Sequence, residues 1–158
     1  MKKFIFLFFM IGFVGVGKCQ TFTLADTSVQ KFDMLRVYHI QFYLAKSDIF
    51  PNSYPFLDSL ADFLNRHQEI KVMEVRCHLD TRWVAESSIR LSGKRAFAIV
   101  DYLVQKGIHP NRLIPMSYDD SKPLISDQEI NEMKTDAEKN AAHYLNRRIE
   151  FVIMELGE

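Results

Sequence analysis

The chain is poor in cysteine and contains no apolar run long enough to cross a bilayer. Among 158 residues only Cys19 and Cys77 are cysteines. One cysteine near the start and one in the middle do not form the disulfide framework of a small secreted protein, so the fold must be held by its own core. Motifs of the H-E-x-x-H and C-x-x-C types are also missing, which removes the most specific signals for a zinc site.

The first residues have the pattern of an export signal. Two lysines precede an uncharged stretch of 14 residues, Phe4–Gly17. A spanning helix needs about 20 apolar residues, so this stretch is too short for an anchor and typical of the middle of a signal peptide. We therefore expect residues 1–19 to be a signal peptide and residues 20–158 to be the exported domain, beginning at Gln20.

A lipoprotein is the alternative, with Cys19 acylated and the protein anchored to a membrane. Lipoprotein sites usually carry a small residue just before the cysteine, whereas Lys18 stands there in this chain. We therefore expect an unlipidated domain, attached to a membrane only through a partner.

Charge excludes nucleic acid as a partner. The whole chain has 20 basic and 20 acidic residues. Loss of residues 1–19 removes three lysines and no acid, which leaves 17 basic residues against 20 acidic ones and a formal charge of −3. A nucleic-acid-binding domain would need a basic face.

Periodicity predicts an alternation of strands and helices in the first half of the exported domain. VYHIQF at 37–42 alternates like a strand, and Ser53 is placed to cap a helix from about Tyr54 to His67. IKVMEVRCHLD at 70–80 predicts a second strand. Cys77 and His78 then point to opposite faces, so Cys77 is expected to be a small core residue rather than part of a catalytic pair.

The second half predicts a longer helix, two strands and a polar surface helix between them. The helix is expected at about 87–106, the strands at 112–118 (near a sheet edge, because of Pro115) and 147–154, and the surface helix at 126–145. Together these elements predict an α+β fold, a two-layer α/β sandwich with a mixed sheet and β-α-β-α-β-β order.

Several short stretches occur in the order of a known family. They are IQF (40–42), HLD (78–80), LSGKRA (91–96), SYDDSKP (117–123) and NRRIE (146–150). With these stretches the chain resembles the OmpA C-terminal-like domain of OmpA, Pal and MotB-type proteins over residues 36–154. The resemblance implies an exported, non-enzymatic domain without a cofactor, in the periplasm or on the periplasmic face of the outer membrane of a Gram-negative-type bacterium. Its implied partner is peptidoglycan, with other envelope proteins as possible further partners.

The resemblance also implies a binding site. In the family an aspartate and an arginine fifteen residues apart hold the ammonium and carboxylate of diaminopimelate, and Asp80 and Arg95 occupy these positions. One anion and one cation are what a zwitterionic amino-acid end requires, and a guanidinium can hold a carboxylate with two parallel bonds. The expected surrounding residues are His78, Ser88 and Arg148, and weaker candidates are Asn146, Arg147 and Trp83.

The chain departs from the family pattern around this site. Cys77 replaces a glycine, Leu79 a threonine, Trp83 a glycine and Ser88 an asparagine, and Leu44 and Ala45 stand where an aspartate is often found. Bulky residues in place of glycine reshape a pocket, and serine has fewer hydrogen-bonding groups than asparagine.

Three alternatives remain open from the residues alone. Asp80 and Arg95 could pair only with each other and stabilise the fold. His78, Asp80 and His39 could approach a metal, or Ser92 beside His78 could act as a nucleophile, but neither set has a characteristic spacing. Finally, the domain could have lost the wall ligand and act as an envelope protein–protein interaction module, with Trp83 as a contact residue.

Overall fold

The fold is built on a four-stranded mixed sheet. This computed structural model describes residues 20–82 and 85–157, without the side chains of 85–90. The expected signal peptide and Trp83 therefore lie outside the described residues. The strand order is β1-β4-β2-β3, in which β4 is antiparallel to both its neighbours and β2 is parallel to β3. The strands are β1 (Met34–Val37), β2 (Ile70–His78), β3 (Leu113–Asp119) and β4 (Arg148–Leu156).

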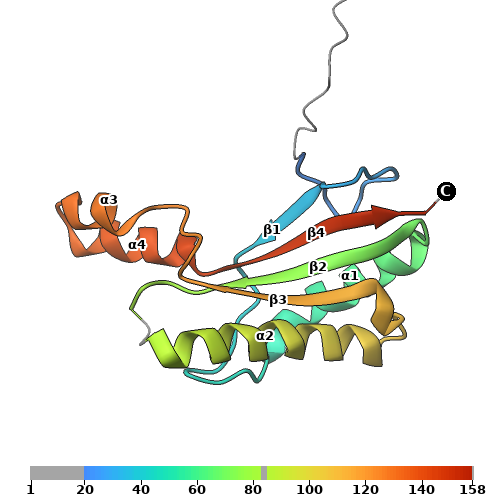
Figure 1. Cartoon of the computed structure of the whole chain (residues 1–158), viewed down its shortest axis with the longest axis horizontal. Coiled ribbons are helices and arrows are strands. Elements are labelled where there is room, and N and C mark those ends of the chain that lie inside the picture. Colours follow the sequence, from blue (N-terminus) through green and yellow to red (C-terminus); the bar gives the residue numbers. More distant parts are fainter. Residues whose placement is uncertain (1–19, 83–84, 158) are drawn as a thin grey trace, which may run out of the picture.

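Two helices cover one face of this sheet, and two shorter helices extend beyond one end of it (Figure 1). The covering helices are α1 (Tyr54–Arg66) and α2 (Ala85–Gln105). Between β3 and β4 lie α3 (Asp127–Glu132) and α4 (Asp136–Asn146). None of the helices in the described part of the chain is long and apolar enough to span a membrane.

The core lies between the sheet and the covering helices, as the periodicity predicts. Val75, Cys77, Phe151 and Ile153 are all almost fully buried on the helical side of the central strands. The apolar stripe of α1 meets them with Leu57, Leu60, Phe63 and Leu64. The expected α+β class with a mixed sheet is therefore confirmed, and β3 is an edge strand as its proline indicates.

The strand predicted at 37–42 is wrong. The chain leaves the sheet at Val37, because β1 pairs with β4 through residues 34–37. Residues 38–50, here called the 38–50 loop, then cross to the helical side, where Ile40 is buried in the core. The alternation of apolar residues predicted correctly that Ile40 is buried, but it is buried by packing in the core and not as part of a strand.

Ser53 fixes this loop instead of capping α1. Its hydroxyl accepts a hydrogen bond from the Gln41 backbone N–H at 2.8 Å and makes no capping bond to the helix. The predicted cap is therefore wrong in its role, although the helix begins at Tyr54 as expected. The loop folds back on itself through a bridge between Phe42 and Ile49, with Ala45 in the left-handed region at φ 55°.

The predicted surface helix at 126–145 is in fact two helices. Ser126 and Thr135 each begin a helix with a complete capping box, closed by Glu129 and Glu138 respectively. An N-cap residue has an extended backbone, and Thr135 has φ −120° and ψ 149°, so the first helix must end before it. α4 then leads directly into β4.

Candidate functional site

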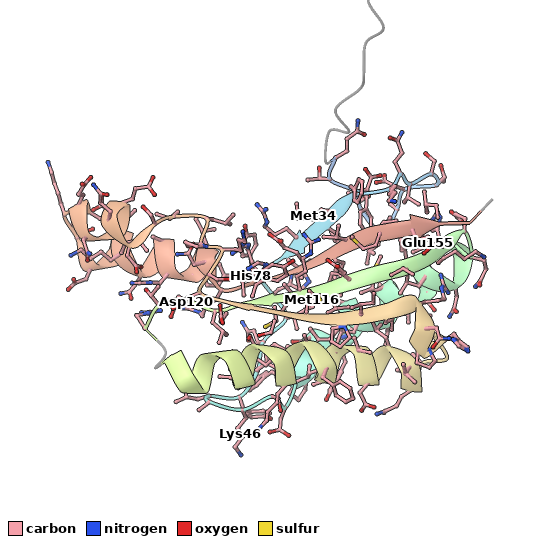
Figure 2. The ribbon with its side chains drawn as sticks, viewed as in Figure 1. Met34, Lys46, His78, Met116, Asp120 and Glu155 are labelled. Carbon is pink, nitrogen blue, oxygen red and sulfur yellow. The ribbon has the colours of Figure 1, made fainter. Side chains whose placement is uncertain are left out.

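A cavity of about 700 Å³ opens beside the end of the sheet from which α3 and α4 extend. Figure 2 labels His78 near this end and Glu155 near the opposite one. The 38–50 loop, the end of β2, α2 and the α4–β4 junction contribute its walls. Its charged and polar lining residues include Gln41, His78, Asp80, Arg82, Arg95, Tyr144, Arg147 and Arg148.

Asp80 follows the last residues of β2 and is almost completely enclosed. Its carboxylate Oδ2 accepts hydrogen bonds from Arg82 Nε at 3.1 Å and Arg82 Nη2 at 2.7 Å, and a further one from Arg147 Nη1. The Arg82 backbone N–H donates to Oδ1 at 3.2 Å. His143 Nδ1 lies 4.0 Å from Oδ2. The side chain of Asp80 is 0% exposed, whereas that of Arg82 is 46% exposed.

These partners keep Asp80 ionised. Burial by itself raises the pKa of a carboxyl group, but the hydrogen bonds and charges of Arg82 and Arg147 outweigh it, so the pKa of Asp80 lies below its usual value. Asp80 is therefore a carboxylate at neutral pH, covered by two guanidinium groups.

Arg95 lies on another wall of the same cavity and is 7% exposed. Its Nε donates to the Lys46 carbonyl oxygen at 2.9 Å, and its guanidinium carbon lies 4.8 Å from the centre of the Phe42 ring. Both contacts come from the 38–50 loop, so this loop orients the guanidinium. Burial lowers the pKa of Arg95, yet an arginine remains charged at neutral pH.

Asp80 and Arg95 share a cavity without pairing with each other. Among the described residues the salt-bridge contacts of Asp80 are made by Arg82, Arg147 and His143. The alternative in which Asp80 and Arg95 merely stabilise the fold as a mutual ion pair is therefore contradicted.

A buried ionic cluster supports the cavity from the open face of the sheet. Glu150 Oε1 accepts from Arg36 Nε at 2.9 Å and Arg148 Nε at 2.8 Å, and Glu150 Oε2 lies 3.3 Å from His78 Nε2. Burial alone would raise the pKa of Glu150, but the neighbouring His78 and Arg148 side chains lower it strongly. The His78 ring stacks on Tyr118, with 5.1 Å between ring centres.

His78 lines the cavity but is held in its neutral form. The contact to Glu150 is 3.3 Å long and lacks hydrogen-bond alignment. Desolvation lowers the pKa of His78, and this effect outweighs the opposing influence of Glu150. His78 therefore contributes shape and polarity to the cavity rather than charge.

The three residues of the N-R-R stretch have different roles. Arg147 donates to Asp80 Oδ2. Arg148 is buried and, besides Glu150, bonds the carbonyl oxygens of Asn146 at 3.1 Å and Lys122 at 2.9 Å. The Asn146 side chain accepts from two backbone N–H groups in the loop before α3, at 2.8 and 3.0 Å. Arg148 and Asn146 thus hold the surroundings of the site in place.

Arg82 is a site residue that the motifs did not predict. Its position two residues after Asp80, at a strand end, is a signal that could have found it, because short side chain-to-backbone and i,i+2 contacts are common in such turns. Ser88 belongs to α2, but its side chain, like Trp83, lies outside the described residues.

Cys77 and the histidines do not form a reactive or metal-binding centre in the described part of the chain. Cys77 is 1% exposed on the core face, as predicted, and burial raises the pKa of its thiol to about 12. His39 packs its ring edge against Phe56 at 4.6 Å between ring centres. Across the described residues, no three His, Cys, Asp or Glu side chains are grouped so as to hold a metal ion.

Comparison with known proteins identifies the family of this chain. The model of the OmpA family matches residues 41–137. The chain is 32% identical to the peptidoglycan-associated lipoprotein of Haemophilus influenzae over 114 residues, which cover 70% of each protein. It is 31% identical to outer membrane porin F of Pseudomonas fluorescens over 111 residues, which cover 70% of this chain but only 31% of the porin. The chain belongs to the OmpA family.

Solved structures show the same fold. A putative MotB-like protein from Desulfovibrio vulgaris superposes with a TM-score of 0.62 at 22% identity, covering 79% of this chain and 74% of that one. The peptidoglycan-associated lipoprotein of Burkholderia pseudomallei gives a TM-score of 0.57 at 20% identity, covering 72% and 86%. The cell wall anchor of the T6SS from Pseudomonas aeruginosa gives 0.58 at 21% identity, covering 77% and 79%.

Proposed function

We propose that this protein binds peptidoglycan without chemical reaction, by holding the diaminopimelate end of a stem peptide in the cavity between the 38–50 loop and α4. One observation carries the proposal: a carboxylate and a guanidinium, Asp80 and Arg95, line one cavity and are each oriented by other partners. The names of the lipoprotein relatives, which associate with peptidoglycan, agree with it.

The proposed chemistry is recognition of a zwitterion. The ligand ammonium approaches Asp80 and the ligand carboxylate approaches Arg95, where a guanidinium can donate charge-assisted bonds. Each such bond contributes about 1.5–3 kcal/mol, so two or three of them support micromolar binding at best. His78, Ser88 and Arg148 surround the pair in this proposal, and no cofactor takes part.

The proposed place of action is the envelope of a Gram-negative-type bacterium. Export would remove residues 1–19 and leave Gln20 as the first residue, on the periplasmic side of the outer membrane. Binding to the wall would contribute to envelope integrity or to attachment of the outer membrane, with other envelope proteins supplying the membrane end.

Co-sedimentation with purified sacculi tests the proposal. The exported domain should sediment with sacculi of the diaminopimelate type, and Asp80→Asn and Arg95→Gln should each weaken binding more than tenfold, since each leaves one end of the zwitterion unpaired. Matched controls come from the surface of the helical layer. Asp58→Asn and Arg66→Gln remove the same charges at positions that do not line the cavity, and should bind like the wild type.

A second function has its own supporting observation. Asp80 is fully covered, while Leu44 in the 38–50 loop is 84% exposed and Tyr43 is 44% exposed. An enclosed acid beside exposed apolar residues fits a module that contacts another envelope protein and no longer binds the wall. This alternative gains support if the wild-type domain fails to sediment with sacculi at low salt.

A further inference from the structure

The carboxylate that should receive the ligand ammonium is already occupied. Two N–H groups of Arg82 and one of Arg147 point at Asp80 Oδ2, and the Asp80 side chain has no exposed surface. An ammonium group has three donors and needs the same oxygen lone pairs. It cannot reach Asp80 unless one of the two guanidinium groups leaves.

Arg82 is the group that can leave more easily. Its side chain is 46% exposed and that of Arg147 is 34% exposed. Arg147 lies between α4 and β4, and its backbone N–H bonds the His143 carbonyl oxygen. Arg82 instead lies in the turn after β2, and beyond Asp80 its guanidinium is held by the Asn140 side chain on α4, at 3.1 Å from Nη1 to Oδ1.

We propose that Arg82 is a latch: its guanidinium occupies the ammonium subsite at Asp80 in the free protein, and a ligand binds only by displacing it. This proposal rests on the proposed function and adds to it a residue that sets affinity and specificity. Arg147 remains on Asp80 when the latch opens, so the acid stays ionised and oriented for the incoming ammonium.

The latch makes the site selective for a zwitterion. With Arg82 closed, the described lining of the cavity has the guanidinium groups of four arginines and the carboxylate of Asp80, which disfavours a lone cation near the cavity. A ligand that brings only an ammonium must displace Arg82 without a compensating contact. A ligand that also brings a carboxylate gains the Arg95 contact at the same time, which offsets the cost of opening.

The apparent affinity equals the intrinsic affinity of the open site multiplied by the fraction of time that the latch is open. A latch that is open about one tenth of the time weakens binding about tenfold relative to an unlatched site. Removing the latch therefore strengthens binding. If Arg82 instead contacted the ligand, removing its side chain would weaken binding, so the sign of the change distinguishes the two roles.

The test uses sacculus co-sedimentation with three variants of the exported domain. Arg82→Ala should bind sacculi about tenfold more tightly than the wild type, the factor expected for a latch open about one tenth of the time. Asn140→Ala removes only the α4 contact of the latch and should shift affinity in the same direction by a smaller factor. Arg66→Ala removes an exposed guanidinium from α1 and should change nothing. Circular dichroism at the assay temperature checks that each variant is folded.

A soluble ligand gives a second readout that does not need a variant. The Arg82 Nε–H resonance in ¹⁵N spectra should exchange slowly with water in the free protein. The tripeptide L-Ala-γ-D-Glu-meso-diaminopimelate should accelerate this exchange as it saturates the site. The same peptide with lysine in place of diaminopimelate keeps the side-chain ammonium but lacks the carboxylate on the carbon that bears it. It therefore offers Arg95 no carboxylate beside the ammonium and should leave the resonance unchanged.

Each contrary outcome has a definite meaning. If the wild type sediments with sacculi and Arg82→Ala binds equally or more weakly, Arg82 is not a latch, while the proposed function stands. If neither the wild type nor Arg82→Ala sediments and the tripeptide does not bind, the proposed function is wrong, and the latch proposal is then wrong as well.

Discussion

Glu150→Gln should destabilise the domain by about 3 kcal/mol, because it removes the charge that compensates a buried arginine. Arg148 is buried, and breaking a buried ion pair by losing one partner typically costs about 3–5 kcal/mol. Two features place the expected loss for Glu150→Gln at the lower end of this range. The Arg148 guanidinium keeps its bonds to two backbone carbonyl oxygens, and the glutamine oxygen can still accept one bond. Arg36 is a third exposed, so losing its pair adds at most about 1 kcal/mol.

Urea unfolding followed by far-ultraviolet circular dichroism measures this loss. In thermal unfolding of a domain of this size, a loss of about 3 kcal/mol corresponds to a fall in Tm of about 6–12 °C. Glu155→Gln is the matched control, since Glu155 is an exposed acid on the same strand and its loss should cost under about 0.5 kcal/mol. If the two variants unfold at the same urea concentration, the ionic cluster does not stabilise the sheet and the reasoning fails.

Three further predictions concern other parts of the chain. Cys77 should react slowly with thiol reagents until denaturant is added, and Cys77→Ser should cost about 1–3 kcal/mol in urea unfolding, because a hydroxyl is then buried without an assured partner. The pKa of His78 is lowered in the folded state, so the unfolded chain binds a proton at this residue first and the free energy of unfolding should fall as the pH drops below about 6.5. In His78→Phe this dependence on pH should be shallower. An unchanged dependence would show that another group causes it. Mass spectrometry of the exported protein should show an unlipidated chain beginning at Gln20, whereas an acylated Cys19 would establish a lipoprotein.

The sequence predicts those parts of the fold whose burial follows a local period. Cys77 and His78 were assigned to opposite faces of a strand correctly, because neighbouring side chains of a strand must alternate. The apolar stripe of α1 likewise follows a local period, whereas its start at Tyr54 was predicted from a Ser53 cap that the structure does not have. The 38–50 loop was not, since its apolar residues alternate like those of a strand while the sheet position beside β4 is filled by residues 34–37.

The candidate site, too, has a part that the sequence predicts and a part that depends on tertiary packing. Asp80 and Arg95, fifteen residues apart, line one cavity, because a strand end and the following helix are adjacent in this fold; their role in binding stays a prediction. The two arginine partners of Asp80 differ in this respect. Arg82 stands two residues after the acid, which is a local signal, whereas only the path of the chain from α4 into β4 brings Arg147 to it. Charge partners at long separation depend on tertiary packing, which no local period records.

The position of β2 has a mechanical consequence. The strand ends two residues before Asp80 and is paired with β4 along its length and with β3 over residues 73–78. Under the proposed function, a pull on a ligand held by Asp80 would therefore enter the most extensively paired strand of the sheet at its end. Where such a pull acts along the strand axis, the hydrogen bonds of both ladders are strained together in shear, rather than opened one after another as they would be at an edge strand. The proposed ammonium subsite thus adjoins the strand of this sheet that is best able to bear a pull along its axis.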